Sequence, residues 1–401
     1  MIHVCFGLHD GDGKYSKFIG AAMASIFVNT AALVTIHILH DATLTADNRQ
    51  KFSELADKYN QYVDFHDTEK ICPNEINLLR EKLADKINSR FSIGMFYRLL
   101  IKKILGAGKA IYLDADIIVN LDIAELWQQD MKNFPVAAVP EIDATNRYMI
   151  IDKFLLKSGR VNVTDYFCSG VMILNLDALD ENFFNDGVKF LVDNPQCESP
   201  DQDILNAFFA ENYLKLEQKF DAFANINRRL NLPVTQKIYH YAGHKLGLDL
   251  DDAYNRLFAE NFSRTPWFNV EVLNHLSKEF RLRNELYCLQ TQLIMGYCAK
   301  HCRAFFVEPH NVEPLKKFFA IQDDEPIIEI RNQNSVRELI DRMTQWRGQK
   351  IFFIIYPDWP RLKNLLTTCG FEEYADYVNG LTLLTQEQGG TYSDRQFVRG
   401  L

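Results

Sequence analysis

Short apolar runs alternate with helical patterns through residues 2–113, and this alternation constrains the fold more than any other feature of the sequence. Each apolar run has the length of a buried strand. Between the runs, apolar residues at helical spacing, such as Phe52, Leu55 and Ala56, indicate amphipathic helices. This alternation predicts an α/β fold with a parallel sheet and crossover helices. The predicted strands are Ile2–Phe6, Leu33–Leu39, Gln61–Phe65 and Ala110–Leu113, and the predicted helices are Ser16–Val28, Thr45–Tyr59 and Ile93–Leu105.

The chain has 401 residues, which is enough for two or three domains. Residues 1–274 hold 28 Lys and Arg against 37 Asp and Glu, whereas residues 275–401 hold 16 of each. This change predicts a large α/β domain over residues 1–270, a helical connector over 271–310 and a small βαβαβ domain over 311–401. The small domain lacks a glycine-rich phosphate loop, so we expect no nucleotide site there. Its predicted elements are the strands Pro326–Ile330, Lys350–Tyr356 and Leu381–Leu384 and the helices Ser335–Met343 and Arg361–Thr368.

The net charge, the cysteines and the first residues bear on the partners and the cellular location of the protein. The net charge of −9 disfavours a nucleic-acid partner, because proteins that bind a phosphate backbone usually carry a basic surface. Eight cysteines are scattered through a large chain, which is typical of reduced thiols in the cytosol. The first residues enter a strand pattern without a signal peptide, and the apolar run Ile351–Ile355 is too short to span a bilayer. These features predict a cytoplasmic protein.

The strongest chemical signal is the pair Asp114 and Asp116, which follows the predicted strand Ala110–Leu113. Ligands bind at the carboxyl ends of strands in open α/β sheets. In an extended backbone, alternate side chains point the same way, so both carboxylates can reach one ion. Hard oxygen ligands suit Mg²⁺ or Mn²⁺. The alternative is an acidic pair that begins a loop and caps a helix near Asp122–Trp127.

Three further segments carry polar groups at the ends of predicted elements. Ser199–Asn206 (SPDQDILN) places three adjacent polar residues at the start of a helix, where one cap would be enough. Tyr166–Asn175 (YFCSGVMILN) is a small-residue turn that enters an apolar strand, and its simple interpretation is a tight turn. Lys237–Lys245 (KIYHYAGHK) places His240 after a strand, beside a glycine and a lysine. A lone histidine of this kind is more often structural.

Taken together, these segments resemble glycosyltransferase family 8, which includes bacterial lipopolysaccharide core α-glucosyl- and α-galactosyltransferases and glycogenin. The resemblance covers about residues 2–265. It rests on the order of the motifs: LDADII, the segment Phe96–Leu99, YFCSG followed by LN, SPDQDILN and HYAG, after a first strand and loop at Cys5–Tyr15 and Ser25–Ile26. The resemblance implies a GT-A fold, a Rossmann-like domain that uses nucleotide-diphospho-sugars, followed here by the smaller α/β accessory domain.

The resemblance also implies roles for individual residues. Asp114, Asp116 and His240 would bind Mn²⁺ or Mg²⁺ between the two phosphates of the donor. Asp201 and Gln202 would lie against the transferred sugar as the catalytic residues. The other implied nucleotide-binding residues are Asp10 or Asp12 at the uracil, Arg98, the backbone at Ala115, Ser169 and Gly170 along the donor, and Gly243 and Lys245 at the phosphates.

The chain departs from the family pattern at three places. Cys168 stands where the family usually has asparagine, which removes a donor to the sugar or phosphate. Lys245 lies one place earlier than the family's lysine, which weakens its assignment. The first loop carries extra residues, so Asp10 and Asp12 compete for the contact with the base.

The predicted function is therefore a metal-dependent retaining hexosyltransferase that moves glucose or galactose from a UDP-sugar to a glycan. The acceptor is a lipopolysaccharide, another cell-surface polysaccharide or a glycoprotein glycan. Gln202 either faces the anomeric carbon as a shield or nucleophile, or the acceptor attacks from the front face. We favour front-face attack because an amide is a poor nucleophile.

Two other classes of function stay open at this point. A sugar-1-phosphate nucleotidyltransferase would need a basic glycine-rich loop, and the segment GLHDGDGKY has a single lysine. A non-catalytic adaptor is favoured only by Cys168 and the shifted Lys245. An acceptor on a lipid carrier would bring the protein to the inner face of the membrane. We expect the C-terminal domain, with Trp346 and Trp359 on its surface, to serve homo-oligomerisation or acceptor recognition.

Overall fold

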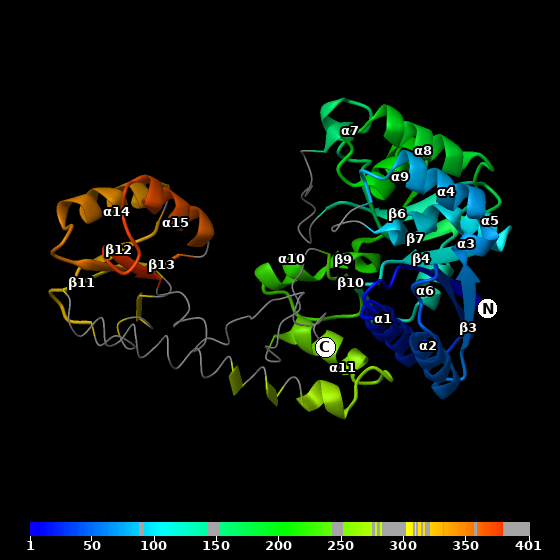
Figure 1. The fold of residues 1–401 in the computed structure, drawn as a ribbon, viewed down its shortest axis with the longest axis horizontal. Coiled ribbons are helices and arrows are strands. Elements are labelled where there is room, and N and C mark those ends of the chain that lie inside the picture. The colour runs from blue at the N-terminus through cyan, green and yellow to red at the C-terminus, as the bar shows by residue number, and fades with distance from the viewer. Residues whose placement is uncertain are drawn as a thin grey trace. The chain divides into compact units, whose positions relative to one another are not determined.

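The computed structural model contains two compact units, one built on Met1–Val272 and the other on Leu273–Tyr392 (Figure 1). It describes residues 1–87, 92–142, 153–242, 252–274, 277–278, 281–282, 302–307, 309, 312–313, 316, 321–331, 333–356 and 359–379. Among these residues, no helix is long and apolar enough to cross a membrane.

The first unit is organised around a seven-stranded sheet with the order β3-β2-β1-β4-β7-β6-β8. β1, β2, β3 and β4 are parallel, as the sequence predicts, and Val4 lies opposite both Ile36 and Ile111. β7 then runs antiparallel between β4 and β6. The bounds are Ile2–Leu8 (β1), Val34–His40 (β2), Tyr62–Asp67 (β3), Lys109–Leu113 (β4), Val136–Pro140 (β6), Phe167–Asn175 (β7) and Leu214–Lys215 (β8).

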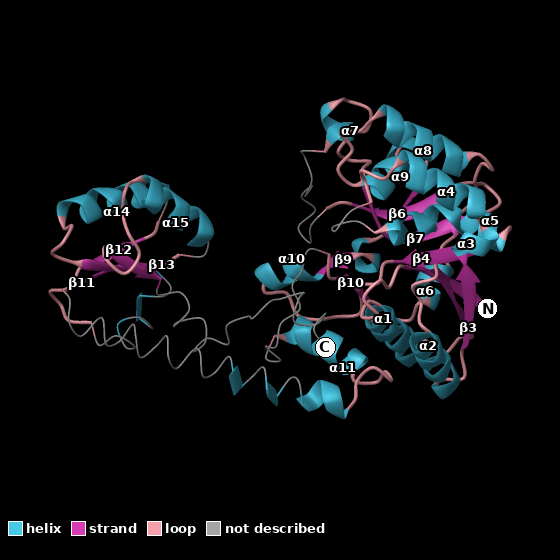
Figure 2. Cartoon of the chain, in the orientation of Figure 1, coloured by secondary structure: helices cyan, strands magenta, loops and turns pink. Residues whose placement is uncertain are grey.

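Helices cover both faces of this sheet (Figure 2). α1 packs against α2 and α11 on one face, and its residues from Ser16 to Phe27 are all buried. On the other face, apolar side chains of α4, α8 and α9, including Leu79, Leu191 and Ile204, form one core with β4 and β7. The bounds are Ser16–Asn29 (α1), Ala46–Lys58 (α2), Thr68–Ile71 (α3), Pro73–Lys82 (α4), Phe183–Asp193 (α8), Pro200–Phe209 (α9) and Ala253–Phe262 (α11).

The predicted α-helix Ile93–Leu105 is wrong over its first eight residues. Ile93–Leu100 is a 3₁₀ helix (η1), and only Ile101–Leu105 is α-helical (α5). η1 lies directly against β1, because a Cβ atom at Gly7 would be 2.7 Å from the carbonyl oxygen of Gly94. This close approach is a tertiary contact, which helical periodicity does not reveal.

A second, three-stranded sheet with the order β5-β10-β9 extends the first unit beside β4. β10 is antiparallel to β5 and parallel to β9, which places His240 opposite Ile117 on one side and Phe223 on the other. The register thus brings the end of β10 next to the residues that follow β4. The bounds are Ile117–Val119 (β5), Ala222–Phe223 (β9), Ile238–His240 (β10), Ala124–Trp127 (α6), Phe154–Lys157 (α7), Gln218–Phe220 (η2) and Ala224–Arg229 (α10).

The second unit contains a parallel sheet with the order β12-β11-β13-β14. Its inner strand β11 (Arg303–Val307) falls in the range predicted as a helical connector, and that prediction is wrong there. Three of its five residues are Phe or Val, types that favour buried strands. The predicted strand Leu381–Leu384 lies outside the described residues. The other bounds are Ile327–Glu329 (β12), Gln333–Gln345 (α14), Ile351–Ile355 (β13), Trp359–Thr368 (α15) and Tyr377–Asn379 (β14).

Trp346 and Trp359 in the second unit are less exposed than the sequence suggests. Trp346 stacks on Phe352 with 6.0 Å between ring centroids, and Trp359 meets the edge of Tyr377 at 5.8 Å. Both are partly buried against the core of this unit. Their rings therefore stabilise the domain's own fold.

Candidate active site

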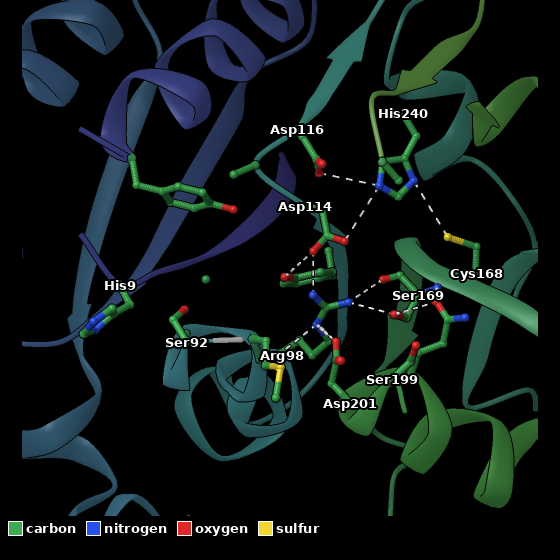
Figure 3. A pocket seen from close by; sticks show the side chains of 18 of the residues that line it. His9, Ser92, Arg98, Asp114, Asp116, Cys168, Ser169, Ser199, Asp201 and His240 are labelled. Carbon is green, nitrogen blue, oxygen red and sulfur yellow. Dashed lines mark hydrogen bonds and ion pairs between the residues drawn. The ribbon is translucent and has the colours of Figure 1, made fainter. Parts of the chain in front are cut away.

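The acidic pair lies at the carboxyl end of β4, in the short link to β5. The backbone there is fixed on both sides: the N–H of Asp114 donates to the carbonyl of Gly170 (2.8 Å), and the N–H of Tyr241 donates to that of Asp116 (2.8 Å). Both carboxylates border a cavity of about 350 Å³, which Figure 3 shows from close by. The carboxylates of Asp114 and Asp116 therefore point into the same cavity, because alternate side chains of an extended chain point the same way.

His240 completes a group of three ligand side chains with Asp114 and Asp116, whose ligand atoms all lie within 4.8 Å of one another. Its Nε2 is 3.5 Å from Oδ1 of Asp116 and 4.0 Å from Oδ2 of Asp114. Two carboxylates and an imidazole form a donor set that suits Mn²⁺ or Mg²⁺. A cation there would also offset the negative charge of the two acids.

Gly170 on β7 makes room for this group. A Cβ atom at this position would lie 2.3 Å from Cε1 of His240 and 3.1 Å from Oδ2 of Asp114. Any side chain would therefore force the imidazole or the backbone of β7 to shift. Gly170 was predicted to bind the donor, and the described geometry gives it a packing role beside the ligands.

Asp221 orients His240 from the side away from the acidic pair. Nδ1 of His240 is 3.0 Å from Oδ1 of this buried carboxylate. With Nδ1 directed at this carboxylate, Nε2 is the ring nitrogen that faces Asp116, and it can bind a cation once it has lost its proton. Burial alone lowers the pKa of His240, but the charge of Asp221 and the hydrogen bonds to Asp116 and Asp221 raise it well above its usual range. No sequence motif marks Asp221, so only the structure reveals its position beside His240.

Arg98 of η1 ties the acidic pair to the neighbouring elements. Its guanidinium bonds Oδ1 of Asp114 (2.5 Å), Oδ2 of Asp201 (3.1 Å), and the backbone carbonyl (2.9 Å) and hydroxyl (2.8 Å) of Ser169. The guanidinium also lies over the ring of Tyr112, 4.4 Å from its centroid. Arg98, Ser169 and Asp201 all border the cavity, and their contact with a donor stays a prediction.

Gln202 reaches the same cavity from the first turn of α9. Its Oε1 accepts from the backbone N–H of Ser169 (3.1 Å) and from its hydroxyl (3.3 Å). Its Nε2 donates to Oε2 of Glu141 (3.0 Å) and to the hydroxyl of Tyr166 (3.2 Å). The amide is thus held at both ends. Glu141, another cavity residue that no motif marks, has its pKa raised to about 7, chiefly by burial.

The residues predicted to contact the base are not in the cavity wall. Asp10 is buried, and its oxygens accept from the N–H of Tyr15 (2.6 Å), the hydroxyl of Ser16 (2.5 Å) and the amide of Asn48 (2.8 Å). It therefore fixes the start of α1. Within the described residues, the exposed Asp12 accepts a local hydrogen bond from the N–H of Lys14.

His9 and Tyr15 line the cavity in their place. His9 is bound through Nδ1 to Oδ2 of Asp41 at 2.6 Å, and the same oxygen accepts from the hydroxyl of Tyr97 at 2.8 Å. The hydrogen bond to Asp41 raises the pKa of His9. Figure 3 shows His9 across Asp114 from Cys168. An imidazole in this wall was not foreseen, because a single histidine in a loop carries no signal.

The remaining predicted residues divide into two groups. Ala115 borders the cavity together with Asp114 and Asp116. Gly243 and Lys245 lie outside the described residues, so their assignment to the donor phosphates stays a prediction.

The chain matches the model of "Glycosyl transferase family 8" over residues 8–245. Among curated relatives, General stress protein A of Bacillus subtilis is 25% identical over 56% of this chain and 76% of its own length. A putative glycosyltransferase of Haemophilus influenzae is 28% identical over 57% of this chain and 64% of its own. The lipopolysaccharide 1,2-glucosyltransferase of Escherichia coli K12 is 23% identical over 75% of this chain and 89% of its own.

Two solved structures show the same fold. The galactosyltransferase LgtC, solved with donor and acceptor sugar analogs, aligns with a TM-score of 0.52 at 19% identity, over 68% of this chain and 99% of that chain. The bifunctional glycosyltransferase WbbM aligns with a TM-score of 0.52 at 22% identity, over 67% of this chain but only 50% of that one. The first unit therefore has the GT-A fold of glycosyltransferases.

Proposed function

The chain belongs to glycosyl transferase family 8 and is a glycosyltransferase, and on that premise we propose that it transfers a hexose from a UDP-sugar to a glycan with retention of configuration. The observation that carries the proposal is the meeting of Asp114, Asp116 and His240 at the rim of a cavity that Arg98 and Gln202 also line. These groups come from four separate parts of the chain. A structural acid pair would need no such convergence.

Asp114, Asp116 and the Nε2 atom of His240 would hold Mn²⁺ or Mg²⁺ at the donor diphosphate. Such an ion stabilises the negative charge that develops on the departing phosphate. Arg98 holds Asp114 in place through one nitrogen of its guanidinium. Asp221 keeps the proton of His240 on Nδ1, so that Nε2 faces the acids. The chain therefore supplies a preorganised set of ligands.

On the sugar side, Asp201 and Gln202 would bind and orient the hexose. Both begin α9, and both are fixed by bonds to neighbouring side chains. Oε1 of Gln202 already accepts from Ser169, which lowers its nucleophilicity further. This supports front-face attack by the acceptor, whose proton would pass to the departing phosphate. Glu141, which accepts from the amide of Gln202, has its pKa raised to about 7 by burial.

On the opposite side, His9 and Tyr15 would receive the uridine. The wall there also contains Gly7 and Gly94, where the two backbones lie close together. The hydrogen bond to Asp41 raises the pKa of His9, and the protonated ring would donate its second N–H to a carbonyl oxygen of uracil. This assignment replaces Asp10 and Asp12, because the oxygens of Asp10 are engaged within the protein.

For the acceptor, we propose a cell-surface glycan, because the relatives named above include a lipopolysaccharide glucosyltransferase. We also propose that transfer takes place in the cytoplasm, at the inner membrane face when the acceptor is lipid-linked. The second unit would serve acceptor recognition or self-association. Its sheet is parallel, as in nucleotide-binding domains. However, the sequence that begins at Arg331, after β12, has no glycine-rich turn that could hold a phosphate.

The direct test is hydrolysis of UDP-glucose and UDP-galactose with Mn²⁺, with and without a chelator. We expect slow release of UDP that needs the ion, and a tenfold or greater loss in Asp116→Ala. Metal-dependent UDP binding without any turnover or transfer would favour the adaptor. Formation of UDP-sugar from UTP and a sugar 1-phosphate would favour the nucleotidyltransferase. Equal UDP binding with and without metal would refute the assignment of the three ligands.

A further inference from the structure

A second group of ligand side chains lies behind His240. Cys168 of β7, Asp221 before β9 and His240 of β10 are all buried, and their ligand atoms lie within 4.8 Å of one another. Nδ1 of His240 is 3.0 Å from Oδ1 of Asp221 and 3.7 Å from Sγ of Cys168. In a tetrahedral site with Zn–N and Zn–O bonds of about 2.0–2.1 Å and Zn–S bonds of about 2.3 Å, the corresponding separations are about 3.4 and 3.6 Å. The two separations from Nδ1 thus lie within about 0.4 Å of the values for a tetrahedral zinc site.

An unpartnered oxygen points to a ligand in this group. Oδ2 of Asp221 is buried and has no hydrogen-bond partner among the described residues. Leaving a charged oxygen buried and unpaired is costly, and a cation beside it removes that cost. Cys168 borders the cavity, which gives an ion a route to the group.

We propose that Cys168, Asp221 and the Nδ1 atom of His240 form a site for Zn²⁺. A thiolate ligand selects a soft or borderline ion over Mn²⁺ or Mg²⁺. Burial keeps the Cys168 thiol protonated without metal, because it raises the thiol's pKa. Binding of Zn²⁺ releases this proton to solvent, since the coordinating sulfur is a thiolate.

Occupation of this site would exclude the donor's metal ion, and this consequence rests on the proposed function. With Nδ1 bonded to Asp221, Nε2 faces Asp116 and can bind an ion once it has lost its proton. With Zn²⁺ on Nδ1, the neutral ring carries its proton on Nε2, which is then no longer a ligand. The same histidine thus serves either ion but not both. Zinc would inhibit by withdrawing one ligand from the donor site.

The site is tested with Co²⁺ as a spectroscopic substitute for zinc in the full-length protein. A tetrahedral thiolate site gives a sulfur-to-cobalt charge-transfer band in the near ultraviolet and strong visible bands. We expect these bands in the wild type and in Cys197→Ser, a matched buried thiol outside the cavity wall. They should be absent in Cys168→Ser and weakened in Asp221→Asn. Circular dichroism confirms folding of each variant. Bands that persist in folded Cys168→Ser would overturn the site.

The exclusion is tested by titrating UDP, with saturating Mn²⁺, at increasing free Zn²⁺. For each protein, the loss of UDP affinity is measured relative to its own affinity without Zn²⁺. We expect this loss in the wild type and in Cys197→Ser. Cys168→Ser should need at least tenfold more Zn²⁺ to reach the same loss. Unchanged UDP affinity in a wild type that shows the cobalt bands would overturn the exclusion. Absence of any metal-dependent UDP binding in a protein with these bands would refute the proposed function and leave the zinc site standing.

Discussion

Replacing Gly170 by alanine tests whether the position of His240 controls binding of the donor's metal. The new Cβ would lie 2.3 Å from Cε1 and 2.8 Å from Nδ1 of His240. Carbon atoms in good contact are about 3.5–4.0 Å apart, so either the ring or the backbone of β7 has to move by about 1 Å. β7 is hydrogen-bonded to strands on both sides, so we expect the ring to move.

The magnitude follows from the tolerance of metal coordination. Ligand distances in metal sites vary by only about 0.2 Å, so an imidazole displaced by about 1 Å is lost as a ligand. Losing the support of a ligand typically lowers metal affinity about 10–100-fold, or about 1.4–2.7 kcal/mol. We expect the Mn²⁺-dependent affinity for UDP to fall by this factor in Gly170→Ala. Calorimetric titration of UDP at fixed Mn²⁺ measures it.

Gly187→Ala is the matched control. Its Cβ would lie 2.8 Å from Cγ2 of Ile204, between α8 and α9, so it also overfills a buried contact. Overfilling costs about 1–3 kcal/mol of stability in either variant. Only Gly170→Ala should also lose UDP affinity. A folded Gly170→Ala protein with wild-type affinity would show that β7 yields instead of His240, and the reasoning would fail.

Three further outcomes are expected. Gln202→Ala should lower transfer by roughly tenfold or more, about 1.4 kcal/mol, while its melting temperature falls by only a few degrees; full activity in a steady-state assay would exclude its role at the sugar. Because burial raises the pKa of Glu141 to about 7, the folded state holds this proton more tightly than the unfolded chain does. Its contribution to the free energy of unfolding is present below pH 4.5 and is lost as the pH rises to about 7. Chemical denaturation of the wild type should therefore show the free energy of unfolding fall by up to about 3 kcal/mol over this range, and Glu141→Gln should lack this fall. The same dependence of unfolding free energy on pH in both proteins would contradict this. A chain that ends at Val272 should still bind UDP in calorimetry but lose self-association or transfer to the true acceptor, and a folded truncation unable to bind UDP would refute the accessory role of the second unit.

Local patterns in the sequence were sufficient for the elements that build the first unit. The four parallel strands and the helices α1 and α2 appear within one or two residues of the predicted bounds. Each of these elements can be predicted from its own segment of sequence, because hydrophobic periodicity and secondary-structure propensity depend on residues a few positions apart. The pattern failed where a tertiary contact overrides it. Ile93–Leu100 has helical spacing, but its approach to Gly7 selects a 3₁₀ helix.

The motifs also identified Asp114, Asp116, His240, Arg98 and Gln202 as candidate site residues, because each stands in a recognisable run of sequence. Their meeting in one cavity depends on the tertiary structure. His240 approaches the acids only because β10 pairs with β5, more than a hundred residues earlier, in one particular register. A shift of one residue would turn the imidazole to the other face of the strand.

The residues around these motif positions were decided by the fold alone. Asp221 orients His240, Glu141 holds Gln202, and His9 replaces Asp10 in the cavity wall. Asp221 and Glu141 stand in no motif, and each gains its role from a residue on another element of the fold. The sequence by itself therefore determined the α/β class and the type of chemistry, because these depend on local patterns and residue types. The tertiary structure decided which partners hold each group, because burial and distance exist only once the strands are paired.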